Sequence, residues 1–379
     1  MSFSYGKFDT LSRGTPSLRK ALVRFHIDVP LLLLISITLV IGLFILYSAS
    51  SHNLVVTFKQ ILRIIFGLLI MWAIALVPPS TIKRWTPNIY VAGLILLVLV
   101  IPFGIEVNGA RRWLGQGSFR FQPSEIFKIA TPMMVAWMLA DAKLPLRFVS
   151  LLLGLIIIGI PTVFIAIEPD LGTAVLVFMS GFIVLFLAGL RWWIIALAVI
   201  LLAASAVPIW KYVLHDYQRE RIATLIFSDE AKNRKGSHWQ SDQSKIAIGS
   251  GGIYGKGYLQ GTQSRHGFLP ESETDFIFAV IGEEFGLAGA IFLLMLYLLI
   301  LFRGLAIALS AQDTFSRLLA GTLSLIFIVY VCINMLMVSG LLPVVGLPLP
   351  MISFGGTSVV TILASFGMLM SIQTHRKLI

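Results

Sequence analysis

Residues 148–167 read FVSLLLGLIIIGIPTVFIAI, and residues 171–189 read LGTAVLVFMSGFIVLFLAG. Neither run contains a charged side chain, and each is close to the ~20 residues with which an α-helix crosses a bilayer. Both runs lack the alternation and the ~10-residue length of membrane β-strands. Because only helices and closed barrels satisfy their backbone groups in lipid, these runs predict two transmembrane helices joined by the turn Glu168-Pro169-Asp170.

Apolar runs of this kind recur along the whole chain. Of the 379 residues, 57% are hydrophobic and 12% are charged, whereas a soluble domain carries roughly 25% charged residues. The composition excludes a soluble protein and predicts an all-α integral membrane protein with about ten transmembrane helices and one large extracytoplasmic loop. The predicted spans are 29–48, 61–77, 88–104, 123–140, 148–167, 171–189, 192–210, 276–302, 316–338 and 351–372.

The basic residues predict the orientation of these spans. With the N-terminus in the cytoplasm, the cytoplasmic segments hold 14 Lys and Arg and the short outer segments hold 6, and such an excess marks the cytoplasmic side. The net charge of +11 is therefore explained by helix flanks rather than by nucleic-acid binding. The chain divides into a cytoplasmic tail (1–28), helices 1–7 (29–210), a large extracytoplasmic loop (211–275), and helices 8–10 with a cytoplasmic C-terminus (276–379).

Two charged residues lie in the first turn of the predicted span 123–140. Glu125 and Lys128 are three residues apart, so they share one face of the helix. Charged residues inside a membrane are costly and usually functional, although a pair that only neutralises itself is the alternative. Arg111 and Arg112 precede this span on the predicted outer side, and their guanidinium groups suit a phosphate or pyrophosphate.

Further acidic residues gather at the predicted outer ends of other spans. Asp170 precedes span 171–189, and Asp275 precedes span 276–302; for both, helix capping is the alternative to a functional role. Of the adjacent Glu283 and Glu284, only one is expected to face the protein interior. A transporter would place its site near the midplane. These acids instead predict a cavity open to the outside, where a carboxylate can act as a general base.

Several short motifs resemble those of the SEDS family of peptidoglycan polymerases, in the order and over the range in which that family carries them. These are Phe121-Gln122-Pro123-Ser124-Glu125 with Lys128, Glu168-Pro169-Asp170-Leu171-Gly172, residues 243–252, residues 268–278, and residues 346–356. Residues 215–219 and 374–377 are more similar to the branch of the family that acts in cell elongation than to the division branch.

The resemblance implies a function. SEDS proteins polymerise lipid II into glycan strands on the outer face of the bacterial cytoplasmic (inner) membrane, with undecaprenyl pyrophosphate as the leaving group. The elongation branch maintains rod shape. The implied partners are lipid II, the nascent glycan strand, a class B penicillin-binding protein, other proteins of the elongation complex and membrane lipids. A divalent cation, Mg or Mn, is consistent with the family, but no metal site follows from the sequence.

The resemblance also implies roles for individual residues. Asp275 matches the essential loop aspartate of the family and is expected to be the catalytic base. Glu125 and Lys128 match the charged pair of the fourth helix, and Arg111 or Arg112 is expected to hold the donor pyrophosphate. The expected substrate-binding residues are Glu125, Lys128, Arg111, Arg112, Asp170 and Lys245.

Two other classes of protein are consistent with the charge pattern. A transporter or flippase of a lipid-linked cell-wall precursor also needs an outward cavity, but it needs no carboxylate for proton abstraction. A non-catalytic scaffold for wall synthesis needs neither. Synthesis of glycan by the purified protein distinguishes the three.

Overall fold

The computed structural model describes residues 26–107, 110–115, 121–142, 147–197, 200, 204, 237–265, 268–269 and 271–376. In these residues the chain is helical except for one small hairpin of β1 (Ile105–Val107) and β2 (Ala110–Trp113) and the connecting turns and loops. The helices are α2 (Val29–Ala49), α3 (Leu54–Ala75), α4 (Pro79–Phe103), α5 (Ser124–Leu139), α6 (Phe148–Ile167), α7 (Leu171–Leu187), α10 (Ser237–Gly251), α11 (Thr262–Arg265), α12 (Ile277–Ser310), α13 (Thr314–Val338) and α14 (Thr357–Thr374).

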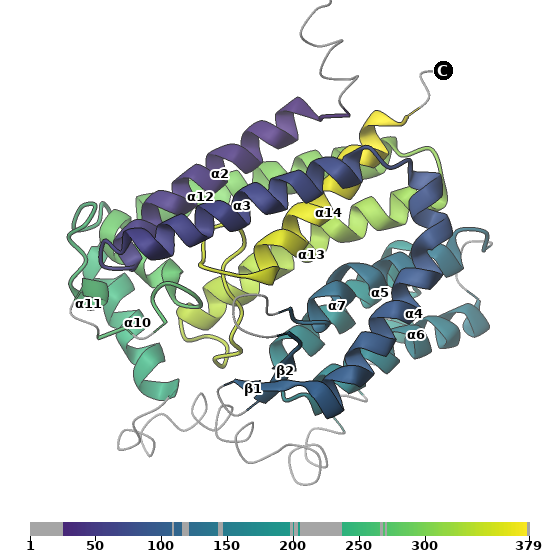
Figure 1. Cartoon of the computed structure of the whole chain (residues 1–379), viewed down its shortest axis with the longest axis horizontal. Helices are drawn as coiled ribbons and strands as arrows, with labels where there is room; N and C mark the ends of the chain where they lie inside the picture. Colours follow the sequence, from purple (N-terminus) through teal and green to yellow (C-terminus); the bar gives the residue numbers. More distant parts are fainter. Residues whose placement is uncertain are drawn as a thin grey trace, which may run out of the picture.

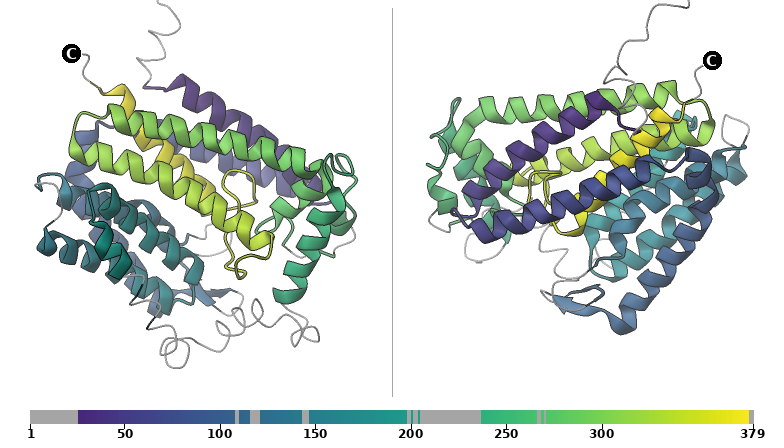
Figure 2. Two further views of the ribbon diagram at one scale, coloured as in Figure 1. Left: turned by 180° about the vertical axis from the view of Figure 1, so that it is seen from behind. Right: turned by 45° about the horizontal axis from the view of Figure 1, so that its top comes forward.

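The long helices form two groups that lie side by side (Figures 1 and 2). One group contains α4–α7, with its own small apolar core around Tyr90, Phe127 and Ile165. The other contains α2, α3 and α12–α14, in which α3 packs along α14 and α12 along α13. The two groups meet where α5 and α7 contact α13.

All ten predicted spans contain helical residues, and nine of them correspond to one of the helices named above. Seven of these helices, α2, α3, α4, α6, α12, α13 and α14, are long and apolar enough to cross a membrane, and α5 and α7 are shorter. For the predicted span 192–210, residues 192–197 are helical and most of the remainder lies outside the described residues.

Three predicted starts, those of α3, α4 and α14, are wrong by more than a helical turn; α14 begins at Thr357 rather than at 351. α3 begins at Leu54 rather than at 61, because the Asn53 side chain accepts hydrogen bonds from the N–H groups of Val55 (3.0 Å) and Val56 (3.4 Å). α4 begins at Pro79 rather than at 88, and proline at the first position favours a helix start. Hydropathy finds the apolar centre of a helix, whereas its caps decide where it begins.

The prediction for Glu283 and Glu284 is also wrong, because both side chains are buried, at 0% and 1% exposure. α12 breaks at Gly286, whose φ of 63° and ψ of −159° are non-helical. Residues of the loop after α10 fold against this break, so that a Cβ at Gly286 would lie 2.5 Å from the backbone nitrogen of Gly255. The loop thus covers the face of α12 that would otherwise be exposed.

The two ends of the described chain lie together at one end of the bundle. His26 hydrogen-bonds Thr374 (3.1 Å) and its ring stacks on that of His375 at 4.1 Å. Helices α10 and α11 and the β-hairpin lie at the opposite end of the bundle (Figure 1).

Candidate active site

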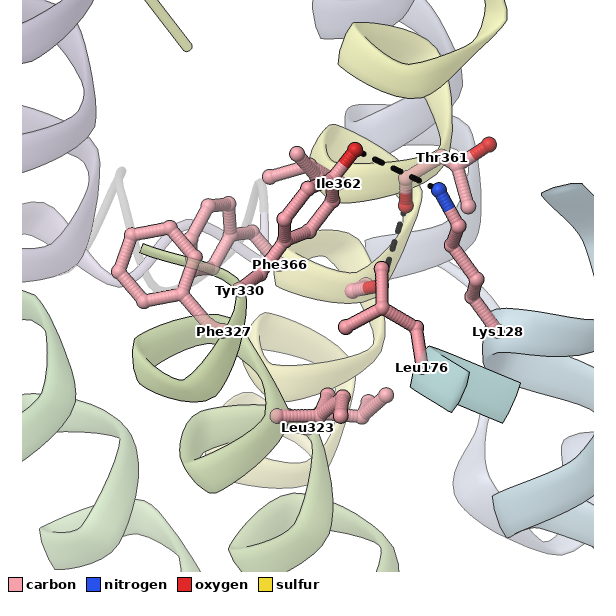
Figure 3. Close-up of a pocket in the computed structure, with 10 residues that line it drawn as sticks. Lys128, Leu176, Leu323, Phe327, Tyr330, Thr361, Ile362 and Phe366 are labelled. Atoms are coloured by element: carbon pink, nitrogen blue, oxygen red, sulfur yellow. Dashed lines mark hydrogen bonds between the residues drawn. The ribbon is translucent and has the colours of Figure 1, made fainter. Parts of the chain in front are cut away.

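A buried ion pair lies at the interface between the two helix groups. The Lys128 ammonium is 2.7 Å from a carboxylate oxygen of Glu125, and the two residues are only 8% and 5% exposed. The expectation that they share a helix face is confirmed. Lys128 also reaches the Tyr330 hydroxyl of α13 at 3.4 Å and lies 4.8 Å from the centre of its ring. The ammonium is therefore held between α5 and α13 (Figure 3).

Asp170 forms a second polar group beside the first. It is the N-cap of α7, and one carboxylate oxygen accepts the Thr173 N–H at 3.2 Å. The other oxygen accepts the Gln122 amide at 2.7 Å, and the Arg112 guanidinium lies 3.9 Å from the carboxylate. Lys128 interacts electrostatically with Asp170 as well. Capping therefore accounts for only one of the contacts that Asp170 makes.

Glu168 lies beside Asp170 in the turn between α6 and α7. The carboxyl is buried, and neither of its oxygens has a hydrogen-bond partner among the described residues. Burial raises the pKa of the Glu168 carboxyl to about 8. The negative charge of Asp170 also raises this pKa, whereas the positive charge of Arg112 lowers it. Glu168 is therefore mostly protonated at neutral pH and adds little negative charge to the site.

Asp275 is half-buried at the end of the loop that leads into α12. Its backbone carbonyl accepts the Asn334 amide at 2.8 Å, and the same amide donates to the Leu347 carbonyl at 2.6 Å. The N-cap of α12 is Phe276, which makes no side-chain cap, so Asp275 does not occupy the capping position. The Asp275 carboxylate interacts electrostatically with Tyr330, as do Lys128 and Glu125.

A cleft opens next to Lys128, between α5, α7, α13 and α14. Lys128 is its only charged lining residue among the described residues, and Tyr330, Thr361 and Ser365 are the other polar ones. The remaining walls are apolar, including Leu176, Leu323 and Phe366. In Figure 3 the Lys128 ammonium points toward the Tyr330 hydroxyl. The cleft thus joins a cationic end to an apolar interior.

The structure does not bring every predicted substrate-binding residue into this group. Arg111 is exposed and pairs with Glu106 of the same hairpin at 3.6 Å. Lys245 is exposed on α10, where it pairs with Asp242 at 3.4 Å and lies against Gly340. Of the two arginines, Arg112 is the one that joins the buried cluster.

Tyr330 and Asn334 were not singled out from the sequence, although both contribute to the site. They are four residues apart on α13, so they project from one face of that helix. One contacts Lys128 and the other holds the backbone of Asp275. Two polar side chains at this spacing within an apolar span were the available signal.

The described part of the site contains no complete set of metal ligands. Within the described ranges, no group of three or more His, Cys, Asp or Glu side chains is placed to hold a metal ion. The carboxylates of the cluster are instead matched by Lys128, Arg112 and Gln122.

Comparisons with known proteins agree on the family. A family profile described as "Cell cycle protein", covering FtsW, RodA and SpoVE, matches residues 28–378. The peptidoglycan glycosyltransferase MrdB of Escherichia coli K12 is 48% identical over 94% of this chain and 96% of its own length. A probable peptidoglycan glycosyltransferase FtsW of Trichlorobacter lovleyi is 34% identical over 95% of this chain and 97% of its own.

Solved structures give the same result. The first is a chain from a peptidoglycan synthase complex that coordinates polymerization and crosslinking. It has a TM-score of 0.79 and 28% identity, and the match covers 91% of this chain and 97% of that chain. The rod shape determining protein RodA of Thermus thermophilus has a TM-score of 0.70 and 26% identity, covering 92% and 98%. This multi-pass membrane protein therefore belongs to the FtsW/RodA/SpoVE family, which is the SEDS family that its motifs resemble.

Proposed function

We infer that this protein is a peptidoglycan glycosyltransferase that polymerises lipid II into glycan strands during cell elongation. The observation that carries the inference is that one face of α13 contacts both parts of the site: Tyr330 contacts Lys128 of the buried Glu125–Lys128 pair, and Asn334 holds the backbone of Asp275. A general base and a buried cation in one site are what a glycosyl transfer with an anionic leaving group requires. The 48% identity to a peptidoglycan glycosyltransferase supports the same reaction.

In this reaction Asp275 takes the proton from the 4-hydroxyl of the acceptor sugar. The acceptor oxygen forms the new bond to C1 of the donor glycan, while the bond between C1 and the pyrophosphate oxygen breaks. The electron pair of that bond leaves with undecaprenyl pyrophosphate. Lys128 and Arg112 are the cations placed to stabilise the growing charge on the leaving group.

The cleft beside Lys128 suits a lipid-linked donor. Its apolar walls offer favourable contacts to a polyprenyl chain, and its cationic end suits the pyrophosphate that the chain carries. Glu125 holds the Lys128 ammonium at 2.7 Å, which fixes its position before substrate arrives. A site of this kind holds the donor with the scissile bond near the outer end of the bundle.

Purified protein incubated with lipid II, followed by a gel of glycan products, tests the function. We expect glycan strands without any other protein present. A flippase instead moves lipid II across vesicle membranes and leaves it unpolymerised, and a scaffold does neither. An outward cavity is compatible with a flippase as well, but a flippase needs no carboxylate for proton abstraction, so Asp275 favours the polymerase.

We propose that both termini face the cytoplasm and that the active site faces outward. The close contact of His26 with Thr374 supports one common side for the two ends. The Lys83–Asp141 ion pair, 3.3 Å long, joins the start of α4 to the end of α5 near the same end of the bundle. The excess of basic residues on this side favours the cytoplasm.

Cysteine labelling tests this orientation. In a Cys332→Ser background, we expect an impermeant maleimide to label Ser241→Cys in spheroplasts, and to leave Lys83→Cys and Arg317→Cys unlabelled. All three should react after permeabilisation, which controls for buried thiols. Labelling of position 83 and protection of position 241 in intact spheroplasts would reverse the proposed orientation.

We also propose a stable complex with a class B penicillin-binding protein. The similarity to a chain from a peptidoglycan synthase complex supports it. We expect the two proteins, expressed together, to elute as one species in mild detergent, whereas an unrelated single-span membrane protein elutes separately. Separate elution of two folded proteins would count against the complex.

A further inference from the structure

Two adjacent carboxylates of α12 are buried away from the cluster around Lys128. Glu283 and Glu284 lie roughly two turns along the chain from Asp275, and they are 0% and 1% exposed. Charged residues within a membrane-spanning helix disfavour insertion, so their presence calls for a physical reason. Their contacts with residues outside α12 are made with the loop between α10 and α12 and with the end of α2.

Glu283 is held by donors from that loop. One carboxylate oxygen accepts from the Lys256 ammonium at 2.7 Å, from the Thr262 N–H at 2.7 Å and from the Thr262 hydroxyl at 2.9 Å. The Gln263 N–H lies 3.1 and 3.2 Å from the two oxygens. A buried carboxylate that accepts from four hydrogen-bond donors holds the backbone at Thr262 and Gln263 firmly in place, because hydrogen bonds to an ionised group are stronger than those between neutral groups.

Two further sets of backbone hydrogen bonds lie between this point and Asp275. The Gln263 carbonyl accepts the N–H groups of Phe268 (3.1 Å) and Leu269 (3.2 Å). The Leu269 side chain is buried at 3% exposure. The Glu271 carbonyl then accepts the N–H of Phe276 at 3.2 Å, across the turn that contains Asp275. The segment that presents Asp275 is therefore anchored at its far end by Glu283.

Glu284 strengthens the same anchor from the side of α2. One of its oxygens accepts the Ser48 hydroxyl at 2.5 Å and the Gly261 N–H at 3.4 Å. Close packing of the loop on α12 is possible because Gly255 adopts φ 78°; a Cβ there would lie 2.1 Å from the Glu284 carbonyl oxygen. Glu283 and Glu284 thus hold the loop between α10 and α12 against α12.

We propose that Glu283, assisted by Glu284, is a positioning residue for the reaction: it holds residues 256–263 on α12 and thereby fixes the segment that presents Asp275 to the acceptor. The inference rests on the proposed function, in which Asp275 is the base. A small displacement of a catalytic group lowers the rate of the chemical step without removing the groups that bind the substrate.

The test is Glu283→Gln in the full-length protein with lipid II as the substrate. We expect the rate at saturating lipid II to fall about tenfold or more, and the KM for lipid II to stay within about twofold. Asp28→Asn is the matched control, because Asp28 forms a partly buried ion pair with Arg303 at the other end of the same helix. It should keep near wild-type activity even where it lowers the melting temperature as much as Glu283→Gln does.

Equal losses of activity in the two variants, in proportion to their melting temperatures, would show a merely structural role and overturn the proposal. If Glu283→Gln fails to fold, Lys256→Met decides, since it removes one donor and leaves the backbone contacts of Glu283. An unchanged rate in Lys256→Met would overturn the proposal, and a fall of about threefold or more at constant KM supports it. Wild-type protein that makes no glycan would instead refute the proposed function itself.

Discussion

Replacing Asp275 with asparagine is expected to reduce polymerisation of lipid II at least ~10²-fold, because a positioned general base contributes ~10²–10⁴-fold to such a step. The acceptor hydroxyl is a poor nucleophile until its proton is withdrawn. The substitution keeps the size of the side chain and leaves the hydrogen bond from Asn334 to the backbone carbonyl in place. Expression and binding of the penicillin-binding protein should therefore be unchanged.

The alternative explanation for Asp275 is a structural one, and a second variant separates the two. Asp313 is the N-cap of α13 and accepts the Ser316 N–H at 2.9 Å, at the end of the bundle remote from Asp275. Asp313→Asn is the same chemical change at a true capping site and should leave the rate within about twofold, since Asn is also a good cap. A folded Asp275→Asn protein that polymerises lipid II at nearly the wild-type rate would mean that another group is the base.

The second large effect concerns the Glu125–Lys128 pair. Glu125→Gln and Lys128→Met should each lower polymerisation by ~10²-fold or more, because Lys128 stabilises the developing charge and Glu125 holds its ammonium in place. Each single change also leaves one buried charge without its partner, which destabilises by about 3–5 kcal/mol, whereas removing both is often nearly neutral. The double variant should therefore regain the melting temperature without regaining activity.

This separation of stability from activity distinguishes a substrate-binding pair from a pair that only neutralises itself. The measurements are the thermal melt and the lipid II gel, made on the wild type, the two single variants and the double variant. Removal of both charges from the Asp28–Arg303 pair is the control, and it should leave both quantities close to wild type. An active Glu125→Gln/Lys128→Met protein would show that the pair serves insertion and folding alone.

The local features of this protein could be predicted from its sequence. The apolar runs identify the membrane-spanning helices, because transfer of a segment into lipid depends on its own side chains. The i,i+3 spacing of Glu125 and Lys128 predicts their contact, since a helix fixes the relative position of such residues. The motifs resembling the SEDS family led to the same family as the comparisons.

The composition of the site depended on contacts that hydropathy does not encode. Tyr330 and Asn334 come from α13, more than 50 residues from Asp275 along the chain, and they join Lys128 and Asp275 only when α5, α12 and α13 pack. The side of a transmembrane helix that faces lipid is as apolar as the side that packs on other helices, so hydropathy alone does not identify the face that turns inward. Burial of both Glu283 and Glu284 likewise required the loop to fold over α12.

The choice between Arg111 and Arg112 also depended on the tertiary structure. The sequence identified a pair of outer arginines suited to a pyrophosphate, but adjacent residues of a strand point to opposite sides. The β-hairpin turns Arg112 toward Asp170 and leaves Arg111 exposed beside Glu106. Residue chemistry and spacing along one element were properties of the sequence, whereas the meeting of side chains from different helices was decided by packing, because it depends on how every other helix in the bundle is placed.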